Sequence, residues 1–287
     1  MTTRSSPHVN VSGTADGVTP APSASRAVAD RLAIGLAGGG VLLQVAYPLL
    51  SGEPLRVATV GSVTLLAAAA VVHAVTVRGW VWGLAMAVTF GGLGLTVEAV
   101  GTATGFPFGS YSYTGTLGLE VLDVPVLVPM AWIMLGYPAF LAGQALGGTR
   151  WGWALGAWTL ATWDLFLDPQ MVQAGHWVWD YPDPGLPGIP GIPLTNYAGW
   201  VFAAVVMMVT MTAIDRAVAR GRGLAPAGRL PHDLVPVAVL VWTYLSQVLA
   251  NLVFFGRPAV AAWGALLMGL TMIPYIRLLL RDRSATP

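Results

Sequence analysis

The sequence predicts an all-α fold, a polytopic integral membrane helix bundle of about eight transmembrane helices with both termini in the cytoplasm. Hydrophobic residues make up 55% of the chain and charged residues only 9%. Apolar runs of about 20 residues, the length that crosses a hydrocarbon core of about 30 Å, recur along the chain. The distribution of arginines then orients the bundle, because positive residues favour the cytoplasmic side of a membrane.

The elements follow in order along the chain. Residues 1–28 are rich in Ser, Thr, Ala, Pro and Gly and contain no apolar run, so we expect a disordered N-terminal tail rather than a targeting segment. Residues 29–283 are expected to form one transmembrane helical domain. Its apolar stretches predict helices at residues 31–50, 57–77, 80–103, 125–146, 151–168, 198–219, 234–254 and 258–280.

All fourteen basic residues are arginines. With eight helices and a cytoplasmic N-terminus, only Arg56 and Arg257 fall outside, whereas a seven-helix chain would break this pattern. The other twelve lie in the tail, in two short turns, in the loop between the sixth and seventh helices and at the C-terminal end: Arg4, Arg26, Arg31, Arg78, Arg150, Arg216, Arg220, Arg222, Arg229, Arg277, Arg281 and Arg283. We expect the cell membrane as the location, with several crossings.

This orientation separates the acidic residues. Glu53, Glu120, Asp123, Asp180 and Asp183 fall in outer loops, whereas three acids stand on predicted helices: Glu98, Asp164 and Asp168. At 1.5 Å per residue, these three lie about 30, 21 and 27 Å from the inner arginines, in the outer half of the membrane. Gln247 and Asn251 reach a similar depth on the seventh helix, and the inner half offers little besides His73.

Each of these side chains has a structural and a functional interpretation. Asp168 precedes Pro169 and could mark a helix end at the water interface. Asp164 lies a turn deeper, where a carboxylate costs about 2.5 to 3.5 kcal/mol, which favours a function. Glu98 could snorkel to the interface. Gln247 and Asn251 could equally be interhelical hydrogen-bonding groups or site residues.

Two segments of the chain repeat a common pattern. A turn arginine, Arg78 or Arg150, is followed by tryptophans, a helix that ends in acidic residues and an aromatic loop. In both copies a proline then stands seven residues before a tryptophan, Pro125 before Trp132 and Pro193 before Trp200. A duplication of this kind predicts that the two outer loops face one another.

The two outer loops are rich in aromatic residues that alternate with Gly and Pro. They contain Phe106, Phe108, Tyr111, Tyr113, Trp177, Trp179 and Tyr181. An aromatic belt at the membrane surface is one interpretation. We favour a folded lid that lines a pocket, because these segments are too short and irregular to be helices.

Several classes of function are excluded or disfavoured. The chain has no cysteine and only four histidines, which excludes disulfides and thiolate metal sites and disfavours a histidine metal centre. Dinucleotide, P-loop and serine-elbow motifs are absent, and nothing indicates nucleic-acid binding.

Five motifs carry a resemblance to a known family. They are TGFPFGSYSYT, VPMAWIMLGYPAF, TWDLFLDPQMV, GHWVWDY and GIPLTNYAGW. In this order they resemble the membrane-embedded carotenoid biosynthesis proteins, which include carotenoid 1,2-hydratases and bisanhydrobacterioruberin hydratases, over about residues 80–215. One departure is the segment YPDPGLPGIPG, where Ile189 and Pro190 replace expected aromatic residues. That difference bears on which end group or chain length is accepted.

The resemblance implies addition of water to the terminal C=C of an acyclic (C40 to C50) carotenoid, giving a tertiary alcohol. Such a hydro-lyase needs a proton donor and a base but no metal, nucleotide or redox cofactor. We assign Asp164 as the donor, Glu98 or Asp168 as the group that deprotonates water, and Asn196 as a polar positioning group. The remaining expected substrate-binding residues are Phe108, Tyr111, Tyr113, Trp132, Trp163, Trp177, Trp179, Trp200 and Asn251.

Two alternatives stay open at this point. A lycopene-type carotenoid cyclase begins with the same protonation but leaves the product mass unchanged. A non-catalytic carotenoid or lipid binder or transporter would bind pigment without making product. The expected partners are an acyclic carotenoid, water, membrane lipid and other carotenoid biosynthesis enzymes, with no nucleic acid.

Overall fold

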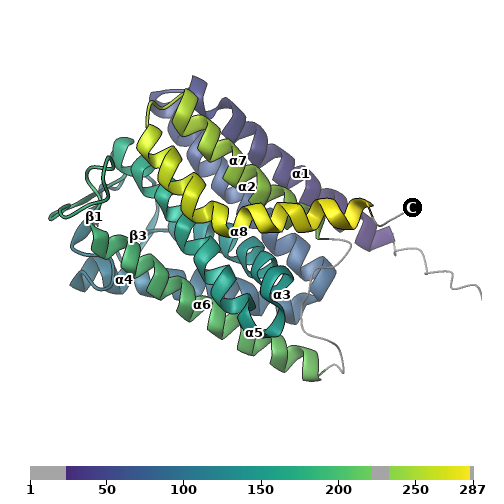
Figure 1. The fold of residues 1–287 in the computed structure, drawn as a ribbon. Coiled ribbons are helices and arrows are strands. Elements are labelled where there is room, and N and C mark those ends of the chain that lie inside the picture. The colour runs from purple at the N-terminus through teal and green to yellow at the C-terminus, as the bar shows by residue number, and fades with distance from the viewer. Residues whose placement is uncertain (1–23, 222–232, 285–287) are drawn as a thin grey trace, which may run out of the picture.

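The computed structural model describes residues 24–221 and 233–284, and it confirms an all-α membrane bundle (Figure 1). In this part of the chain seven helical runs are long and apolar enough to cross a membrane. The continuous α-helices among them are α1 (Ala24–Ala46), α2 (Gly52–Arg78), α5 (Leu127–Gln173), α6 (Leu194–Gly221), α7 (Leu234–Val253) and α8 (Pro258–Ser284). The disorder predicted for residues 1–23 falls outside the described residues, and α1 begins at Ala24, inside the predicted tail.

The remaining crossing helix is built from three pieces. It runs through α3 (Trp80–Ala87), the π-helical turn η2 (Val88–Gly92) and α4 (Leu93–Thr104). A further short 3-10 helix, η1 (Tyr47–Leu49), follows α1, with Pro48 in its first turn. The predicted helix 31–50 therefore continues into a different helical form near its end.

The helix α5 is two membrane crossings rather than one. Gly148 leaves the helical conformation, with φ 55° and ψ −150°. Gly143 then lies against the backbone of the following arm, so that a Cβ on it would be 2.3 Å from the carbonyl oxygen of Gly152. Because Gly156 similarly lies against Ala139, the two arms pack as an antiparallel hairpin. The described residues therefore provide eight helical segments that can cross a membrane, the number that the sequence predicts.

Two short antiparallel strand pairs stand between the helices. β1 (Tyr111–Tyr113) pairs with β4 (Trp177–Trp179), and β2 (Glu120–Val121) pairs with β3 (Val124–Pro125). The first pair joins the two aromatic loops, as the repeat predicts. It lies at the end of the bundle opposite the C-terminus (Figure 1).

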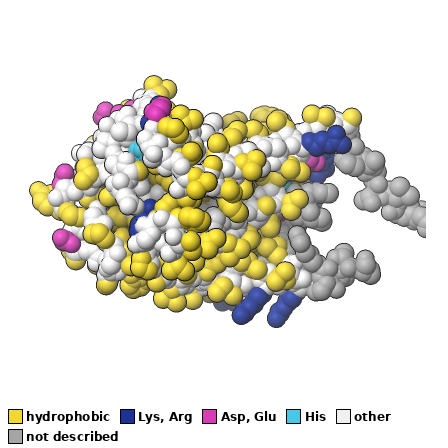
Figure 2. Space-filling view, turned by 90° about the horizontal axis from the view of Figure 1, so that it is seen from above, with side chains coloured by type: hydrophobic (Ala, Val, Ile, Leu, Met, Phe, Trp, Pro, Cys, Tyr) yellow, Lys and Arg dark blue, Asp and Glu magenta, His cyan; other side chains and the backbone are white. Residues whose placement is uncertain are grey.

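The two ends of the bundle differ in charge. Figure 2 shows most of the visible acidic side chains at one end and most of the visible arginines toward the other, with a largely apolar band between them. Arg216 donates to the carbonyl oxygen of Thr149 in the turn of α5, which places Arg150 and Arg216 at the same end. α1 begins and α8 ends near one another at the arginine-rich end (Figure 1), so the arrangement fits termini on the same side of the membrane.

Candidate active site

The two aspartates lie on one face of the second arm of α5, one turn apart, and both are buried. Asp164 is 0% exposed and Asp168 is 3% exposed. The helix continues through Pro169 to Gln173, so the interpretation of Asp168 as a helix end in water is wrong. A proline removes one backbone hydrogen bond, but here the apolar packing of the arm maintains the helix beyond it.

Asn196 joins the two aspartates from the first turn of α6. Its Nδ2 donates to Oδ2 of Asp164 at 2.8 Å and also to Oδ2 of Asp168. The other oxygen of Asp164, Oδ1, is buried without a hydrogen-bond partner among the described residues. An amide side chain therefore sets the relative position of two carboxyl groups in the interior of the bundle.

Glu98 on α4 is another buried carboxyl group at this end of the bundle, 5% exposed. The hydroxyls of Tyr111 and Tyr113 donate to its Oε2 at 2.6 and 2.8 Å, and the indole nitrogen of Trp132 donates to its Oε1 at 3.1 Å. All three neighbours are donors, which suits an ionised carboxylate because that group only accepts hydrogen bonds. Glu98 is thus held inside the bundle rather than snorkelling to the interface.

The aromatic loops form a folded lid over these groups. Tyr111 lies opposite Trp179 and Tyr113 lies opposite Trp177 in the β1–β4 register, with ring centroids 5.6 Å apart in both pairs. Burial, followed by the neighbouring Glu98, raises the pKa of both tyrosines. Their hydroxyls therefore stay protonated around neutral pH and continue to donate to Glu98.

His176, which the sequence argument did not single out, fixes the edge of this lid. Its Nδ1 lies 2.8 Å from the hydroxyl oxygen of Thr116, and its carbonyl oxygen accepts from the backbone nitrogen of Thr114. Burial, followed by the charge of Arg56, lowers the pKa of His176. A neutral imidazole is therefore expected at pH 7.

A cavity lies between the lid and the helices, and we call it the carboxylate cavity. Both Glu98 and Asp168 line it, from the two helices α4 and α5. Asn196 and the aromatic residues Phe108, Tyr111, Tyr113, Trp132, Trp177, Trp179 and Trp200 also line it. The rings of Trp132 and Trp200, the equivalent tryptophans of the two repeats, stack with centroids 4.1 Å apart.

Three of the residues predicted from the sequence do not line this cavity. Asp164 lies behind it, in contact through Asn196. Trp163 packs edge-on against Trp200 at 5.9 Å. Asn251 is buried on α7, where its Nδ2 donates to the carbonyl oxygen of Gln247 at 2.9 Å, so it acts as an intrahelical group.

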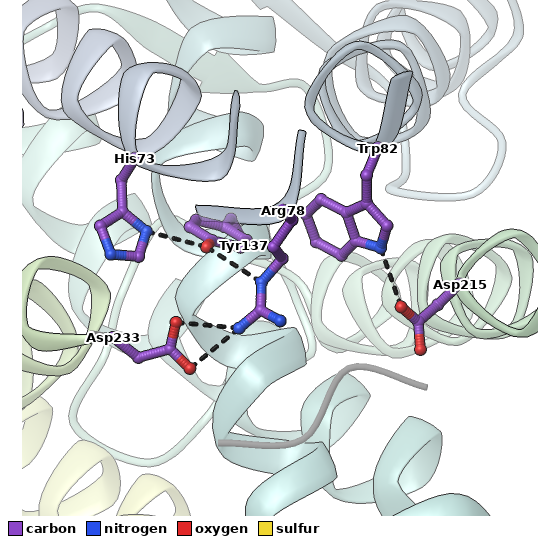
Figure 3. Close-up of polar contacts among 6 residues, drawn as sticks. All are labelled: His73, Arg78, Trp82, Tyr137, Asp215 and Asp233. Atoms are coloured by element: carbon purple, nitrogen blue, oxygen red, sulfur yellow. Dashed lines mark hydrogen bonds and ion pairs between the residues drawn. The ribbon is translucent and has the colours of Figure 1, made fainter. Parts of the chain in front are cut away.

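A second polar cluster, at the opposite end of the bundle, contradicts the expectation that the inner half holds little besides His73. Figure 3 shows His73 and Arg78 both directed at the hydroxyl of Tyr137, at 2.9 and 3.4 Å. Arg78 also makes two 2.8 Å hydrogen bonds to Asp233. These partners come from separate helices, so no local pattern in the sequence links them to Arg78.

Trp82 and Asp215 extend this inner cluster. The indole nitrogen of Trp82 donates to Asp215 at 2.8 Å, and the guanidinium of Arg78 lies 5.3 Å from the centre of the Trp82 ring (Figure 3). Asp215 was missed although it stands on the predicted helix 198–219. None of these residues lines the carboxylate cavity, so we assign the cluster to packing of α2, α3, α5, α6 and α7.

Comparisons with known proteins agree with the motifs. A profile of the family described as "Carotenoid biosynthesis protein" matches residues 59–271, more than half of the chain. A protein named bisanhydrobacterioruberin hydratase from Haloarcula japonica is 35% identical over 178 residues, which cover 59% of this chain and 58% of the relative. The match thus spans less than two thirds of that relative's length. No solved structure matches the chain. On the extent of the profile match, the chain belongs to the carotenoid biosynthesis protein family.

Proposed function

We propose that this protein is a hydro-lyase that adds water to the terminal C=C of an acyclic C40 to C50 carotenoid in the cell membrane. The observation that carries the proposal is that two carboxyl side chains, Glu98 and Asp168, line one aromatic cavity in the interior of the bundle. The similarity to a protein named as a hydratase supports the same reaction. The atoms of the carotenoid and of one water account for the whole product without net oxidation or reduction, so the reaction needs no redox cofactor.

The geometry suggests a change in the roles assigned from the sequence. Asp164 was assigned as the donor, but Asp168 is the aspartate that lines the cavity. We therefore propose Asp168 as the proton donor, with Asp164 and Asn196 positioning it from behind. Glu98, which accepts from three donors, is the group we propose to take a proton from water.

The proposed reaction proceeds through a tertiary cation. Asp168 gives a proton to the less substituted alkene carbon, and the π electrons form the new C–H bond. The cation on the other carbon lies among tryptophan and tyrosine faces, each of which stabilises a nearby cation by about 0.5 to 2 kcal/mol. The oxygen of water then bonds to that carbon, and Glu98 accepts the proton that water releases.

The experiment is expression in cells that make acyclic C40 or C50 carotenoids, with product analysis by mass in water labelled with ¹⁸O. The expected product is heavier than its precursor by one labelled water for each end that reacts. Glu98→Gln should abolish this product, whereas Glu120→Gln, an exposed loop carboxyl, should not.

Three other outcomes would overturn the proposal. A new product of unchanged mass would indicate the lycopene-type cyclase. Stoichiometric bound pigment without product would indicate a carotenoid or lipid binder or transporter. Full activity of Glu98→Gln would remove Glu98 from the chemistry. Co-purification from such cells would also reveal whether other carotenoid biosynthesis enzymes are partners.

A further inference from the structure

A second cavity adjoins the carboxylate cavity, and we call it the polar chamber. It lies between α1, η1, α2, α5 and α7. Its described lining contains no charged residue but includes several hydroxyl and amide side chains, among them Gln44, Thr59, Ser62, Gln170, Thr243 and Gln247. These groups come from the four helices α1, α2, α5 and α7.

The chamber reaches from the lid end of the bundle to the carboxylate cavity. Tyr47 and Phe255, which follow the outer ends of α1 and α7, line it with their rings 6.0 Å apart. At the other end Thr59, Val63, Leu167 and Met171 line both cavities. Thr59 is the one polar side chain among these four, so it stands where the two cavities meet.

The chemistry of the lining suits water. A buried water is held by about three hydrogen bonds to polar groups, and a cavity of this kind is occupied only where such groups are present. The hydroxyl of Thr59 donates to the carbonyl oxygen of Leu55 at 2.9 Å, and those of Ser62 and Thr243 donate to their own helices at 3.1 and 2.8 Å. Each hydroxyl oxygen thus keeps lone pairs that can accept from water.

We infer that the polar chamber stores and delivers the water that attacks the carotenoid cation, and that Thr59 positions this water at the junction with the carboxylate cavity. This inference rests on the proposed hydratase function. The carboxylate cavity itself is mainly aromatic and apolar, which excludes bulk water from the cation. A separate uncharged chamber supplies the nucleophile without placing a further base beside the acid.

The test separates proton transfer from water capture. Purified protein in lipid vesicles is given the acyclic carotenoid that the wild-type protein hydrates, in D₂O. Hydration is measured as added water, and protonation is measured as deuterium at the terminal isoprene unit of recovered carotenoid. A cation that is not captured by water loses a proton and returns to the alkene, so it retains deuterium.

Thr59→Val should lower hydration about tenfold, the loss expected for one positioning hydrogen bond, while the ratio of deuterium exchange to hydration rises. Thr59→Ser should restore the wild-type ratio. Gln170→Leu, which replaces a second chamber amide, should change the ratio in the same direction. A purely structural defect would lower both signals together.

Thr89→Val is the matched control. Thr89 is 4% exposed like Thr59, and its hydroxyl donates to the carbonyl oxygen four residues earlier, but it lines none of the described cavities. If Thr59→Val and Gln170→Leu show the same ratio of deuterium exchange to hydration as Thr89→Val, the polar chamber is not the source of the water. If the wild-type protein neither exchanges nor hydrates any acyclic carotenoid, the proposed function itself fails.

Discussion

Asp164 and Asp168 share the amide of Asn196, yet only Asp168 lines the carboxylate cavity. At the residue scale this difference predicts unequal effects of two matched substitutions. Asp168→Asn should lower the rate of hydration by about 100- to 10,000-fold, the usual contribution of a positioned acid. Asp164→Asn should lower the rate of hydration less, because Asp164 acts only by positioning Asp168 through Asn196.

The measurement is product formed per milligram of folded protein, with Glu120→Gln as the control for a carboxyl outside the cavity. The opposite order, with Asp164→Asn inactive and Asp168→Asn active, would return the donor role to Asp164.

The tyrosines that hold Glu98 predict a pH dependence of stability. Burial raises the pKa of Tyr111 above its usual value, so the folded state binds this proton more tightly than the unfolded chain does. The stabilisation is complete below the unfolded pKa of about 10 and is lost as pH rises toward the folded value. The unfolding temperature of the wild-type protein should therefore fall above about pH 10.

Tyr111→Phe should show a smaller fall over the same pH range, and Tyr181→Phe, an exposed tyrosine, should behave as wild type. Thermal unfolding in detergent between pH 7 and 11 measures this. Identical alkaline profiles for Tyr111→Phe and wild type would show that burial of this hydroxyl contributes nothing.

Most of the individual residues at the site were predictable because charged residues make up only 9% of this chain. Glu98, Asp168 and Asn196 stand out against apolar surroundings, and seven predicted aromatic residues line the cavity with them. The role of Asn251 was not predictable, because packing decides whether an amide side chain forms hydrogen bonds within its own helix or to another helix. The inner partners of Arg78 come from α5 and from the start of α7, and no local pattern links them.

At the element scale, the hairpin of α5 depends on a close approach between its arms. A Cβ on Gly143 would lie 2.3 Å from the carbonyl oxygen of Gly152 and 2.5 Å from the backbone nitrogen of Gly156. Because these are backbone atoms, they cannot turn aside as a flexible side chain can. Gly143→Ala should therefore destabilise the fold by about 1 to 3 kcal/mol, a typical cost of overpacking.

Unfolding in detergent measures this cost, with Gly35→Ala as the control. Gly35 on α1 is exposed and would meet no atom within 4 Å, so alanine there should be neutral or slightly stabilising. Equal free energies of unfolding for Gly143→Ala and Gly35→Ala would show that the two arms of α5 can move apart without loss of stability.

The sequence predicted the helices well and the shorter elements poorly. Apolar length identifies a membrane crossing, and the turn at Gly148 is marked by two glycines and Arg150. The fifth helix was predicted to end at residue 168 because Pro169 locally disfavours a helix, but packing of this arm of α5 continues the helix to Gln173. The β1–β4 pair was foreseen only as two facing loops, since three-residue strands leave no periodic pattern.

The inner cluster acts between elements, and its ion pair predicts a large effect on stability. Arg78 and Asp233 have side chains 5% and 1% exposed and are joined at 2.8 Å. Removing one partner of a buried pair typically costs about 3 to 5 kcal/mol, because the other charge stays in the interior. Asp233→Ala should therefore lower the free energy of unfolding strongly while leaving the carotenoid products of the folded fraction unchanged.

Glu53→Ala is the comparison, because its pair with Arg56 is exposed and water replaces the lost interaction. A similar small effect of both substitutions would show that the Arg78 pair does not hold the helices together.

For the whole molecule, the distribution of charge predicts how the eight helical segments are oriented in the membrane. The arginine count predicts that the turn at Gly148 faces the cytoplasm and that the lid faces outward, as the opposite charges of the two ends suggest (Figure 2). The chain contains no cysteine, so single cysteines can be introduced without background labelling of native thiols.

Thr149→Cys and Leu119→Cys place thiols at exposed positions at opposite ends of the bundle. In intact cells an impermeant maleimide should label Leu119→Cys and should label Thr149→Cys only after the membrane is opened. The reverse pattern would place the carboxylate cavity near the cytoplasm, and labelling of both from outside would mean that α5 does not cross the membrane twice.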